Sequence, residues 1–227
     1  MRLPIARQGW PFILPLLGLA VIGLMTLPIG GGVLLVLAVF VTYFFRDPER
    51  TIPTEPGVFL SPADGQVVGI EPHAQGPDGR IGTRLSIFLS VLDVHVNRAP
   101  LAGTVLAITY QPGKFMPAFR PEAGTVNEQN VVTLQTGTGQ VVVRQIAGIL
   151  ARRIVCWVKP GDTLSAGERF GLIRFGSRVE VFIPAAFEVR AQLGQKVRGG
   201  KSILAAAERY PEVLGPSGTH ASGRTHT

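Results

Sequence analysis

The sequence predicts a mainly β domain that stands behind an N-terminal membrane hairpin of two helices. No charged side chain occurs in residues 9–45, which are dominated by Leu, Val, Ile, Phe and Gly. After Pro53 the chain consists of short β-branched runs separated by Gly, Pro and Asp, with almost no helical periodicity. We therefore assign residues 1–50 to the hairpin and residues 51–209 to the β domain. Residues 210–227, rich in Gly, Ser, Thr and Pro, are expected to form a disordered tail.

Composition narrows the function classes. Only 16% of the 227 residues are charged, against roughly 25% in an average soluble domain, and the mean hydropathy is +0.30. This excludes a disordered chain and indicates a membrane protein. The net charge of +7 favours an anionic partner, either nucleic acid or an acidic lipid surface. A single cysteine, Cys156, cannot form an internal disulfide, and no metal site is expected because no Cys/His cluster has zinc-ligand spacing.

The apolar run is too long for one simple membrane span. A single helix over residues 9–45 would measure about 55 Å, against roughly 30 Å for the hydrocarbon core. Pro28 and the glycines at 30–32 offer a break that leaves two arms of about seventeen residues, near the lower limit for spanning. Arginines flank the run on both sides, so the positive-inside rule places the rest of the chain at the cytoplasmic face of the cell membrane. The alternatives are a buried hairpin in a soluble protein and a cleaved signal peptide, whose apolar core would be shorter.

Strands are expected throughout the soluble part. The safest pair is a β-hairpin in which residues 131–135 pair with residues 140–145 across the Gly-containing turn at 136–139. The other expected strands are residues 65–70, 83–89, 103–109, 154–158, 170–174, 179–183 and 187–192.

A short internal repeat indicates how these strands fold together. Residues 161–167 and 194–200 share the frame Gly-x-x-aliphatic-x-x-Gly, and both lie between expected strands. Such glycine-framed turns recur in barrel-sandwich folds of the lipoyl and biotinyl carrier type, and residues 61–65 offer a third turn at a strand entry. The expected fold class is therefore mainly β, with a barrel-sandwich domain behind the hairpin.

The bond between Gly176 and Ser177 is the first candidate for chemistry. The pair lies between two apolar strands. A glycine before a serine lets the backbone bend so that the hydroxyl can approach the preceding carbonyl, as nucleophilic attack requires. Most Gly-Ser pairs are plain polar turns, so the assignment depends on its context.

A second group of polar residues follows the expected strand 83–89. Alternation along an extended segment puts Asp93, His95 and Asn97 on one face, where a carboxylate can orient an imidazole base. The alternative is a solvated strand rim. The neighbouring Arg98 could bind a phosphate or carboxylate through its fork of donors.

A third segment ends in the paired arginines Arg152 and Arg153. Doubled arginines near a membrane suit an anionic head group, and the alternative is an exposed basic turn.

Seven motifs follow one another in order behind the membrane segment. They are Phe44-Phe45-Arg46-Asp47-Pro48, Ser61-Pro-Ala-Asp64-Gly65, Asp93-Val-His95-Val-Asn97-Arg98, Tyr110-Gln-Pro-Gly113-Lys114-Phe115, Asn127-Glu128, Gln145-Ile-Ala-Gly148 with Ala151-Arg152-Arg153-Ile154, and Phe175-Gly176-Ser177-Arg178-Val179. Together they resemble the small bacterial type of phosphatidylserine decarboxylase proenzyme. No single motif is decisive, but the resemblance covers almost everything before the tail.

The resemblance implies a self-processing enzyme. The Ser177 hydroxyl attacks the Gly176 carbonyl, the resulting ester undergoes β-elimination, and Ser177 ends as an N-terminal pyruvoyl group, the covalent cofactor. The protein is then a heterodimer of residues 1–176 and 177–227. A Schiff base between this carbonyl and the amine of phosphatidylserine acts as an electron sink for the loss of CO₂, which yields phosphatidylethanolamine.

The resemblance also implies which residues take part. In the family, the base that starts self-cleavage is attributed to an Asp and a His that act with the serine, here Ser177. Asp93 occupies the matching Asp position. The longer family members carry a histidine in the stretch that corresponds to residues 114–119, where this chain has none. His95 is then the only histidine in a motif, and we predict it as the base. Arg98, Arg152 and Arg153 are the candidates for binding the phospholipid.

Two other function classes compete with the enzyme. A membrane-tethered carrier or adaptor module would need an exposed lysine at a tight turn, and Lys196 or Lys201 lies near the second glycine-framed turn. A membrane-anchored nucleic-acid-binding protein is disfavoured because the basic residues are scattered and no aromatic platform alternates with them. A higher homo-oligomer is plausible because pairing between protomers would close exposed β edges.

Overall fold

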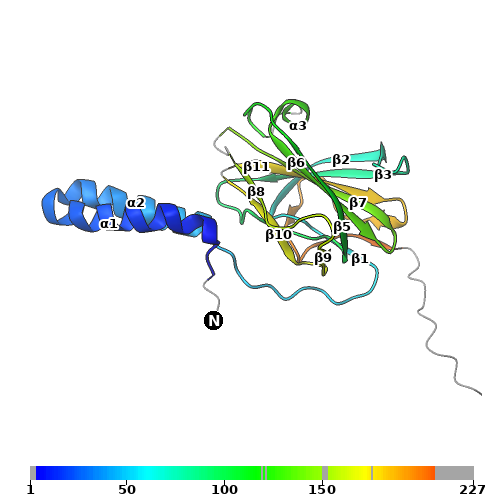
Figure 1. Cartoon of the computed structure of the whole chain (residues 1–227), viewed down its shortest axis with the longest axis horizontal. Helices are drawn as coiled ribbons and strands as arrows, with labels where there is room; N and C mark the ends of the chain where they lie inside the picture. Colours follow the sequence, from blue (N-terminus) through cyan, green and yellow to red (C-terminus); the bar gives the residue numbers. More distant parts are fainter. Residues whose placement is uncertain (1–3, 119, 121, 150–152, 175, 208–227) are drawn as a thin grey trace, which may run out of the picture.

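A computed structural model describes residues 4–118, 120, 122–149, 153–174 and 176–207. Its N-terminal part is a helical hairpin that projects away from a β domain (Figure 1). Helix α1, Trp10–Thr26, follows a 3-10 turn at Arg7–Gly9, and α2 is Pro28–Phe44. The expected tail, 210–227, lies outside the described residues.

The sequence correctly predicts a hairpin, but the break is narrower than expected. Only Leu27 separates the two helices, and the glycines at 30–32 lie inside α2. Gly31 has a packing role instead, because a Cβ there would overlap the backbone of Gly23 and Leu24 in α1. The segment Arg7–Thr26 is long and apolar enough to cross a membrane, and α2 is a shorter apolar helix.

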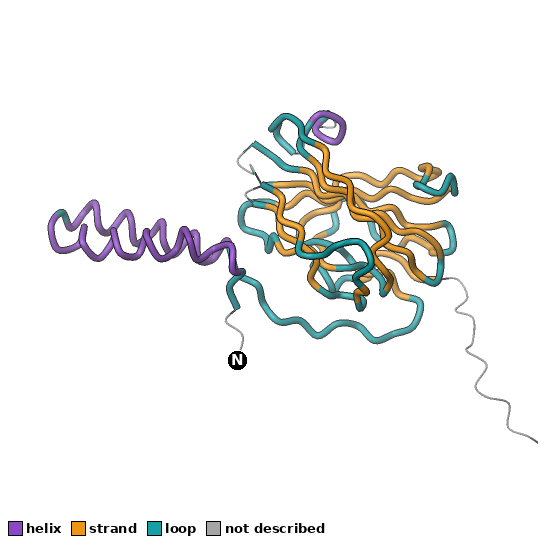
Figure 2. The backbone as a smooth tube through the Cα atoms, viewed as in Figure 1, coloured by secondary structure: helices purple, strands orange, loops and turns teal. Residues whose placement is uncertain are grey.

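The β domain consists of one curled eight-stranded antiparallel sheet and two three-stranded sheets (Figures 1 and 2). The strand orders are β13-β2-β3-β11-β7-β6-β5-β9 in the large sheet, and β1-β14-β12 and β4-β10-β8 in the small ones. The strands are β1 Val58–Leu60, β2 Gly65–Gln75, β3 Ile81–Leu89, β4 Val96–Arg98, β5 Gly103–Gln111, β6 Gln129–Thr136, β7 Gly139–Ile146, β8 Ile154–Cys156, β9 Thr163–Leu164, β10 Arg169–Ile173, β11 Ser177–Pro184, β12 Phe187–Val189, β13 Lys196–Val197 and β14 Ile203–Ala207. A single-turn helix, α3 Ala123–Val126, precedes β6.

Most of the longer strands lie where the sequence predicts them. The β6–β7 hairpin has the predicted register, with Gln135 opposite Gln140. The very short strands β1, β9 and β13 were not foreseen, because two or three residues are too few to show a two-residue period.

The core lies inside the curl of the large sheet. Strand β11 shows the arrangement, because Val179, Val181 and Ile183 point inward to the main apolar cluster, with Phe59 and Phe170 from other sheets. The residues between them, including Glu180, point to the outer face and are also buried. A strand covered on both faces holds its first residue, Ser177, firmly in place.

The two glycine-framed turns adopt the same backbone structure at opposite ends of the large sheet. Gly161, Gly167, Gly194 and Gly200 all have positive φ, between 72° and 94°, a region that favours glycine. Each frame encloses a two-residue strand, β9 paired with β5 and β13 paired with β2. The internal repeat therefore corresponds to a structural repeat, as expected for a barrel-sandwich domain.

The hairpin contacts the β domain through the end of α2 and the two residues after it, Phe44 to Arg46, which we call the hairpin foot. Phe44 and Phe45 are fully buried and form a second apolar cluster with Val94, Val96 and Leu172 of the β domain. The connecting segment that follows runs along the outside of the domain to β1 (Figure 2). The hairpin foot and the β4-β10-β8 sheet thus meet at one end of the domain.

Candidate active site

The Gly176–Ser177 bond lies at the entry to β11. Gly176 has a φ of +64°, in the left-handed region, and Ser177 opens the strand opposite Leu89 of β3. Ser177 is fully buried, and its Oγ has no hydrogen-bond partner among the described residues. A buried hydroxyl without a partner costs roughly 1–3 kcal/mol, so a reactive role accounts for a group that packing alone disfavours.

His95 reaches this bond from the segment before β4. Its Nε2 accepts a hydrogen bond from the Gly176 N–H at 3.3 Å, and its Nδ1 donates to the Asp93 carbonyl at 3.0 Å. A carbonyl can only accept, which fixes the proton on Nδ1 and leaves the lone pair on Nε2. Burial lowers the pKa of His95 from 6.5 to about 4, despite the opposing effect of Asp93, so the ring is neutral at pH 7.

Much of this burial comes from the hairpin foot. The ring of Phe44, at the end of α2, lies 4.3 Å from the His95 ring between centroids, and both side chains are fully buried. Arg46 donates to the Leu92 carbonyl at 2.6 Å, which ties the same foot to the segment that carries His95. The N-terminal hairpin is therefore part of the wall around the candidate base.

The Gly176 carbonyl has a close neighbour on another segment. A Cβ on Gly148 would overlap the Gly176 oxygen, so only glycine leaves room for that carbonyl. Asn127 fixes this neighbourhood, because its Nδ2 donates to the Ala147 carbonyl at 2.7 Å and to the Met116 carbonyl at 2.8 Å. Asn127 and Gly148 both lie in sequence motifs, but no local pattern shows which residues they contact in the fold.

Asp93 does not adopt the geometry that alternation predicts. Strand β4 begins only at Val96, and Asp93 lies in the preceding turn, where its Oδ2 accepts from the Ser90 N–H and Oγ at 2.8 Å each. The expectation of one shared strand face for Asp93 and His95 is therefore wrong. Asp93 reaches His95 through its main-chain carbonyl, while its carboxylate closes the turn that presents the ring.

Arg98 is buried and already engaged. It donates to the Gly167 carbonyl at 3.0 Å and to the Pro48 carbonyl at 3.1 Å, and it lies 3.7 Å from the buried Asp47. Burial, followed by repulsion from nearby arginines, lowers the pKa of Arg98 to about 10. These contacts fasten the connecting segment to the domain, so substrate binding by Arg98 would compete with a structural role.

Of the paired arginines, Arg152 lies outside the described residues and Arg153 is exposed. Arg153 accepts a main-chain hydrogen bond from Arg174, whose guanidinium lies 5.3 Å from the ring centre of Phe12 in α1. Burial and repulsion from Arg153 lower the pKa of Arg174. Arg153 and Arg174 therefore bring positive charge to the side of the domain from which the hairpin projects.

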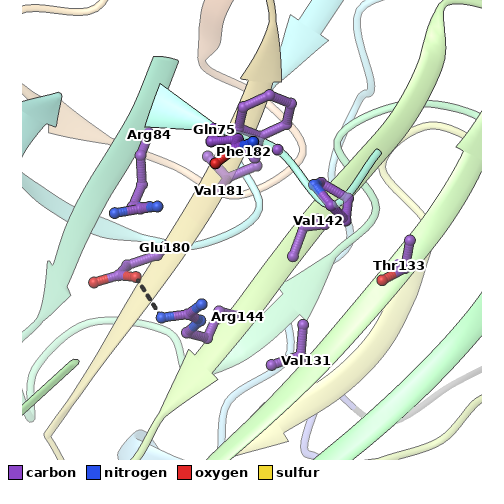
Figure 3. Close-up of a pocket in the computed structure, with 11 residues that line it drawn as sticks. Gln75, Arg84, Val131, Thr133, Val142, Arg144, Glu180, Val181 and Phe182 are labelled. Carbon is purple, nitrogen blue, oxygen red and sulfur yellow. Dashed lines mark hydrogen bonds and ion pairs between the residues drawn. The ribbon is translucent and has the colours of Figure 1, made fainter. Parts of the chain in front are cut away.

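A cavity of about 230 Å³ lies elsewhere, on the outer face of the large sheet. Figure 3 shows Arg84, Arg144 and Glu180 around it, with Arg144 donating to Glu180. Its lining contains neither a histidine nor a nucleophilic Ser or Cys. Among the described residues, no group of three His, Cys, Asp or Glu side chains could hold a metal ion. Among the described residues, Ser177 and His95 are therefore the best candidates for nucleophilic and acid–base chemistry.

The family model for phosphatidylserine decarboxylase matches residues 37–205, which include every part of this site. The chain belongs to the phosphatidylserine decarboxylase family. A phosphatidylserine decarboxylase proenzyme of Symbiobacterium thermophilum is 50% identical over 210 residues, covering 90% of this chain and 96% of the relative. Proteins of the same name from Burkholderia vietnamiensis and Burkholderia pseudomallei are each 43% identical, and each is covered over 97% of its length.

Membership in this lyase family agrees with the resemblance in the motifs and disfavours the carrier and nucleic-acid classes. The word proenzyme in the names of these relatives implies that those proteins are processed from a precursor. Sequence reasoning missed Phe44 and Gly148 as parts of the site. The sequence feature that could have pointed to them is their position in the Phe-Phe-Arg-Asp-Pro and Gln-Ile-Ala-Gly motifs.

Proposed function

We propose that this protein cleaves its own Gly176–Ser177 bond to create a pyruvoyl group and then decarboxylates phosphatidylserine to phosphatidylethanolamine. One observation carries the proposal. The buried, unpartnered Ser177 hydroxyl follows a left-handed glycine whose N–H is bound by a neutral imidazole. Family membership supplies the substrate class.

The first step is an acyl shift within the chain. Ser177 Oγ attacks the Gly176 carbonyl carbon as His95 Nε2 takes the hydroxyl proton. The C–N bond then breaks, the Ser177 nitrogen leaves as an amine after gaining that proton, and an ester joins the two segments. His95 must first release the Gly176 N–H, which its 3.3 Å hydrogen bond permits at modest cost.

The second step is elimination. Loss of the Ser177 Cα proton breaks the Cβ–O bond of the ester, so residues 1–176 leave with a carboxylate end and residue 177 becomes a dehydroalanine. Tautomerisation and addition of water release ammonia and leave the pyruvoyl ketone. This ketone can take up the electron pair that remains when CO₂ departs.

The fold keeps both products of cleavage together. Strand β11 pairs with β3 from Ser177 to Pro184 and with β7 from Arg178 to Phe182. Apart from the first pair, Ser177 with Leu89, these ladders are formed on the β11 side by residues that follow the Gly176–Ser177 bond. Residue 177 therefore stays buried beside His95, and the protein becomes a heterodimer of residues 1–176 and 177–227.

The apolar N-terminal hairpin supports a location of this chemistry at a lipid surface. We infer that the hairpin inserts in the cell membrane with the β domain on the cytoplasmic face, as the flanking arginines favour. The apolar side chains at its far end point outward, with Met25 83% and Ile29 85% exposed. Arg153 would then face anionic head groups, and Arg98 would act mainly through the connecting segment.

Intact-mass spectrometry of the purified full-length protein, with and without borohydride, tests the proposal. We expect two chains split at Gly176–Ser177, with a borohydride-reducible carbonyl at the end of the smaller one. Ser177→Ala should give one inactive chain, and His95→Gln should slow cleavage at least a hundredfold. Asp93→Asn, which weakens the turn at Ser90, should slow it less. A single intact wild-type chain would overturn the self-cleavage and leave the carrier-like module to be tested.

A further inference from the structure

The two glycine-framed turns share a backbone but differ in charge. The turn at 161–167 carries Asp162 and is followed by Glu168, whereas the turn at 194–200 carries Lys196 and Arg198 and is followed by Lys201. Structural requirements alone explain the shared glycines, but they do not explain why only one turn is basic. The difference therefore points to the surroundings of the second turn.

These surroundings form a pocket of about 430 Å³ at the hairpin foot. Arg198 and Lys201 line one side, and Arg46 and Arg50 line the other. Val94, the residue that precedes His95, also lines the pocket. The pocket thus joins the basic turn, the end of the membrane hairpin and the segment that carries the candidate base.

A buried ion pair and its hydrogen bonds hold the two sides of this pocket together. Arg50 pairs with Asp64 through both guanidinium nitrogens, at 2.6 and 2.8 Å, and both side chains are about nine-tenths buried. Gly199 joins the pair twice, because its N–H donates to Asp64 at 2.8 Å and its carbonyl accepts from Arg50. The basic turn is therefore locked onto the start of the β domain.

The positive charge in the pocket is only partly balanced. Asp64 is used by Arg50, and the other acidic lining residue, Glu49, is paired with Arg169 at 3.0 Å. Within the described part of the chain, Arg46, Arg198 and Lys201 have no ion-pair partner. The guanidinium of Arg46 is held by the Tyr43 and Leu92 carbonyls and lies over the Tyr43 ring, but none of these groups neutralises its charge. Three cations without a carboxylate partner around one pocket attract an anion with several acceptor oxygens.

The position of the pocket indicates the source of that anion. The apolar helix α2 ends at Phe44, and Arg46 follows after the single buried residue Phe45. Where such a helix leaves the hydrocarbon core, its flanking residues lie at the level of the lipid phosphates. A lipid phosphate can therefore reach the pocket without leaving the membrane surface.

We propose that the pocket formed by Arg46, Arg198 and Lys201 binds the phosphate of an anionic phospholipid and presents the substrate's head group to the Ser177 site. The substrate role of the pocket rests on the proposed function, whereas its binding of a lipid phosphate does not depend on that function. After cleavage the pocket joins both chains, because Arg46 belongs to residues 1–176 and the other two cations to residues 177–227. The bound phosphate then also bridges the two halves of the enzyme.

Binding is tested first without catalysis. The full-length Ser177→Ala protein, in neutral detergent micelles, is titrated calorimetrically with dihexanoyl phosphatidylglycerol, which has the phosphate but no amine. We expect the additional changes Arg198→Ala and Lys201→Ala to weaken binding roughly 30-fold, because each basic residue near an anionic surface contributes about fivefold. Dihexanoyl phosphatidylcholine, which has no net charge, and inorganic phosphate are titrated in parallel.

The matched control is Arg190→Ala with Lys196→Ala. These residues are also exposed cations of the C-terminal segment, and neither lines the pocket. The control should bind the anionic lipid like the parent. Equal loss in both double variants, or no loss in either, would overturn the site. Binding of inorganic phosphate as tight as that of phosphatidylglycerol would overturn the assignment to a lipid.

The substrate role is tested in the cleaved enzyme. In mixed micelles of phosphatidylserine and phosphatidylcholine, Arg198→Ala with Lys201→Ala should raise KM at least tenfold and change kcat less than twofold, because the carbonyl and His95 are untouched. Intact mass should show normal cleavage in this variant. Unchanged KM would overturn the substrate role, whereas failure of the wild type to cleave would count against the proposed function alone.

Discussion

The end of the β domain that meets the hairpin and the outer face of its large sheet share strand β11 but bury different groups. At the hairpin end, β11 begins with Ser177, whose hydroxyl has no partner among the described residues. On the outer face, Glu180 pairs with Arg178 at 2.8 Å and with Arg144 at 3.5 Å. The hairpin end therefore leaves a buried hydroxyl without a partner among the described residues, whereas the outer face pairs its charged groups with one another.

This difference teaches how to separate reactivity from stability in one strand. Removing one partner of the buried ion pairs on the outer face should lower stability, because it leaves a buried charge without compensation. At the hairpin end, a neutral imidazole and a free hydroxyl lie on either side of one glycine. Substitutions in the two regions should therefore affect different measurements.

The largest effect is expected at Gly148. In Gly148→Ala the new methyl group overlaps the Gly176 oxygen, so the scissile carbonyl must move and self-cleavage should slow more than a hundredfold. Gly137→Ala is the control, because a Cβ there meets nothing within 4 Å. The fraction of cleaved chain over time, read by mass spectrometry, distinguishes them. Equal cleavage rates would show that this close approach is irrelevant to the reaction.

The next effect concerns the hairpin foot. In Phe44→Ala, water reaches the His95 ring and its pKa rises from about 4 towards 6.5. The charged groups that also act on the ring are Asp93, Arg46 and Asp64. If cleavage needs neutral His95, its rate should then begin to fall at a higher pH as the solution is acidified. We expect the acid limb of the pH–rate profile to move up by about one to two pH units.

The outer face offers the matching ring deletion for this test. Phe182→Ala removes a ring that is 6% exposed, and both variants should lose about 3–5 kcal/mol of stability. Only Phe44→Ala should move the acid limb of the cleavage profile. A shift of the same size in both would attribute the effect to general loosening of the fold.

A smaller effect is expected in the pH dependence of stability. The folded-state pKa of His95, about 4, lies below the unfolded value of 6.5, so the unfolded chain binds the proton first as pH falls. Folding stability should therefore drop between pH 6.5 and pH 4, by about 3 kcal/mol from this group. Chemical unfolding of Ser177→Ala in detergent, with and without His95→Gln, measures the contribution. A slope that His95→Gln leaves unchanged would assign the pH dependence to other groups.

The smallest effect on cleavage is expected for Glu180→Gln. The substitution weakens the ion pairs with Arg178 and Arg144 and should lower stability by about 1–3 kcal/mol. Self-cleavage at 25 °C should stay within about twofold of the wild type, because the ion pairs of Glu180 involve neither Gly176 nor His95. Slower cleavage with unchanged stability would show that the two regions are coupled.

The sequence by itself determined the hairpin, the longer strands, the glycine-framed repeat and the Gly-Ser pair. Each is a local pattern: an uncharged run of a given length, a two-residue period, or glycines at positions where φ is positive. The motif order also led to the family. These features depend on neighbours within a few residues, so they are visible without the fold.

Only the tertiary structure decided what surrounds the reactive bond. Phe44 and His95 are 51 residues apart, and Gly148 approaches the Gly176 oxygen from a different strand connection. The turn at Asp93 overrode the predicted alternation, because Ser90 offers the carboxylate two hydrogen bonds that an extended strand would lose. Burial sets the pKa of His95, and burial is a sum over contacts that are distant in sequence, so no local pattern could reveal it.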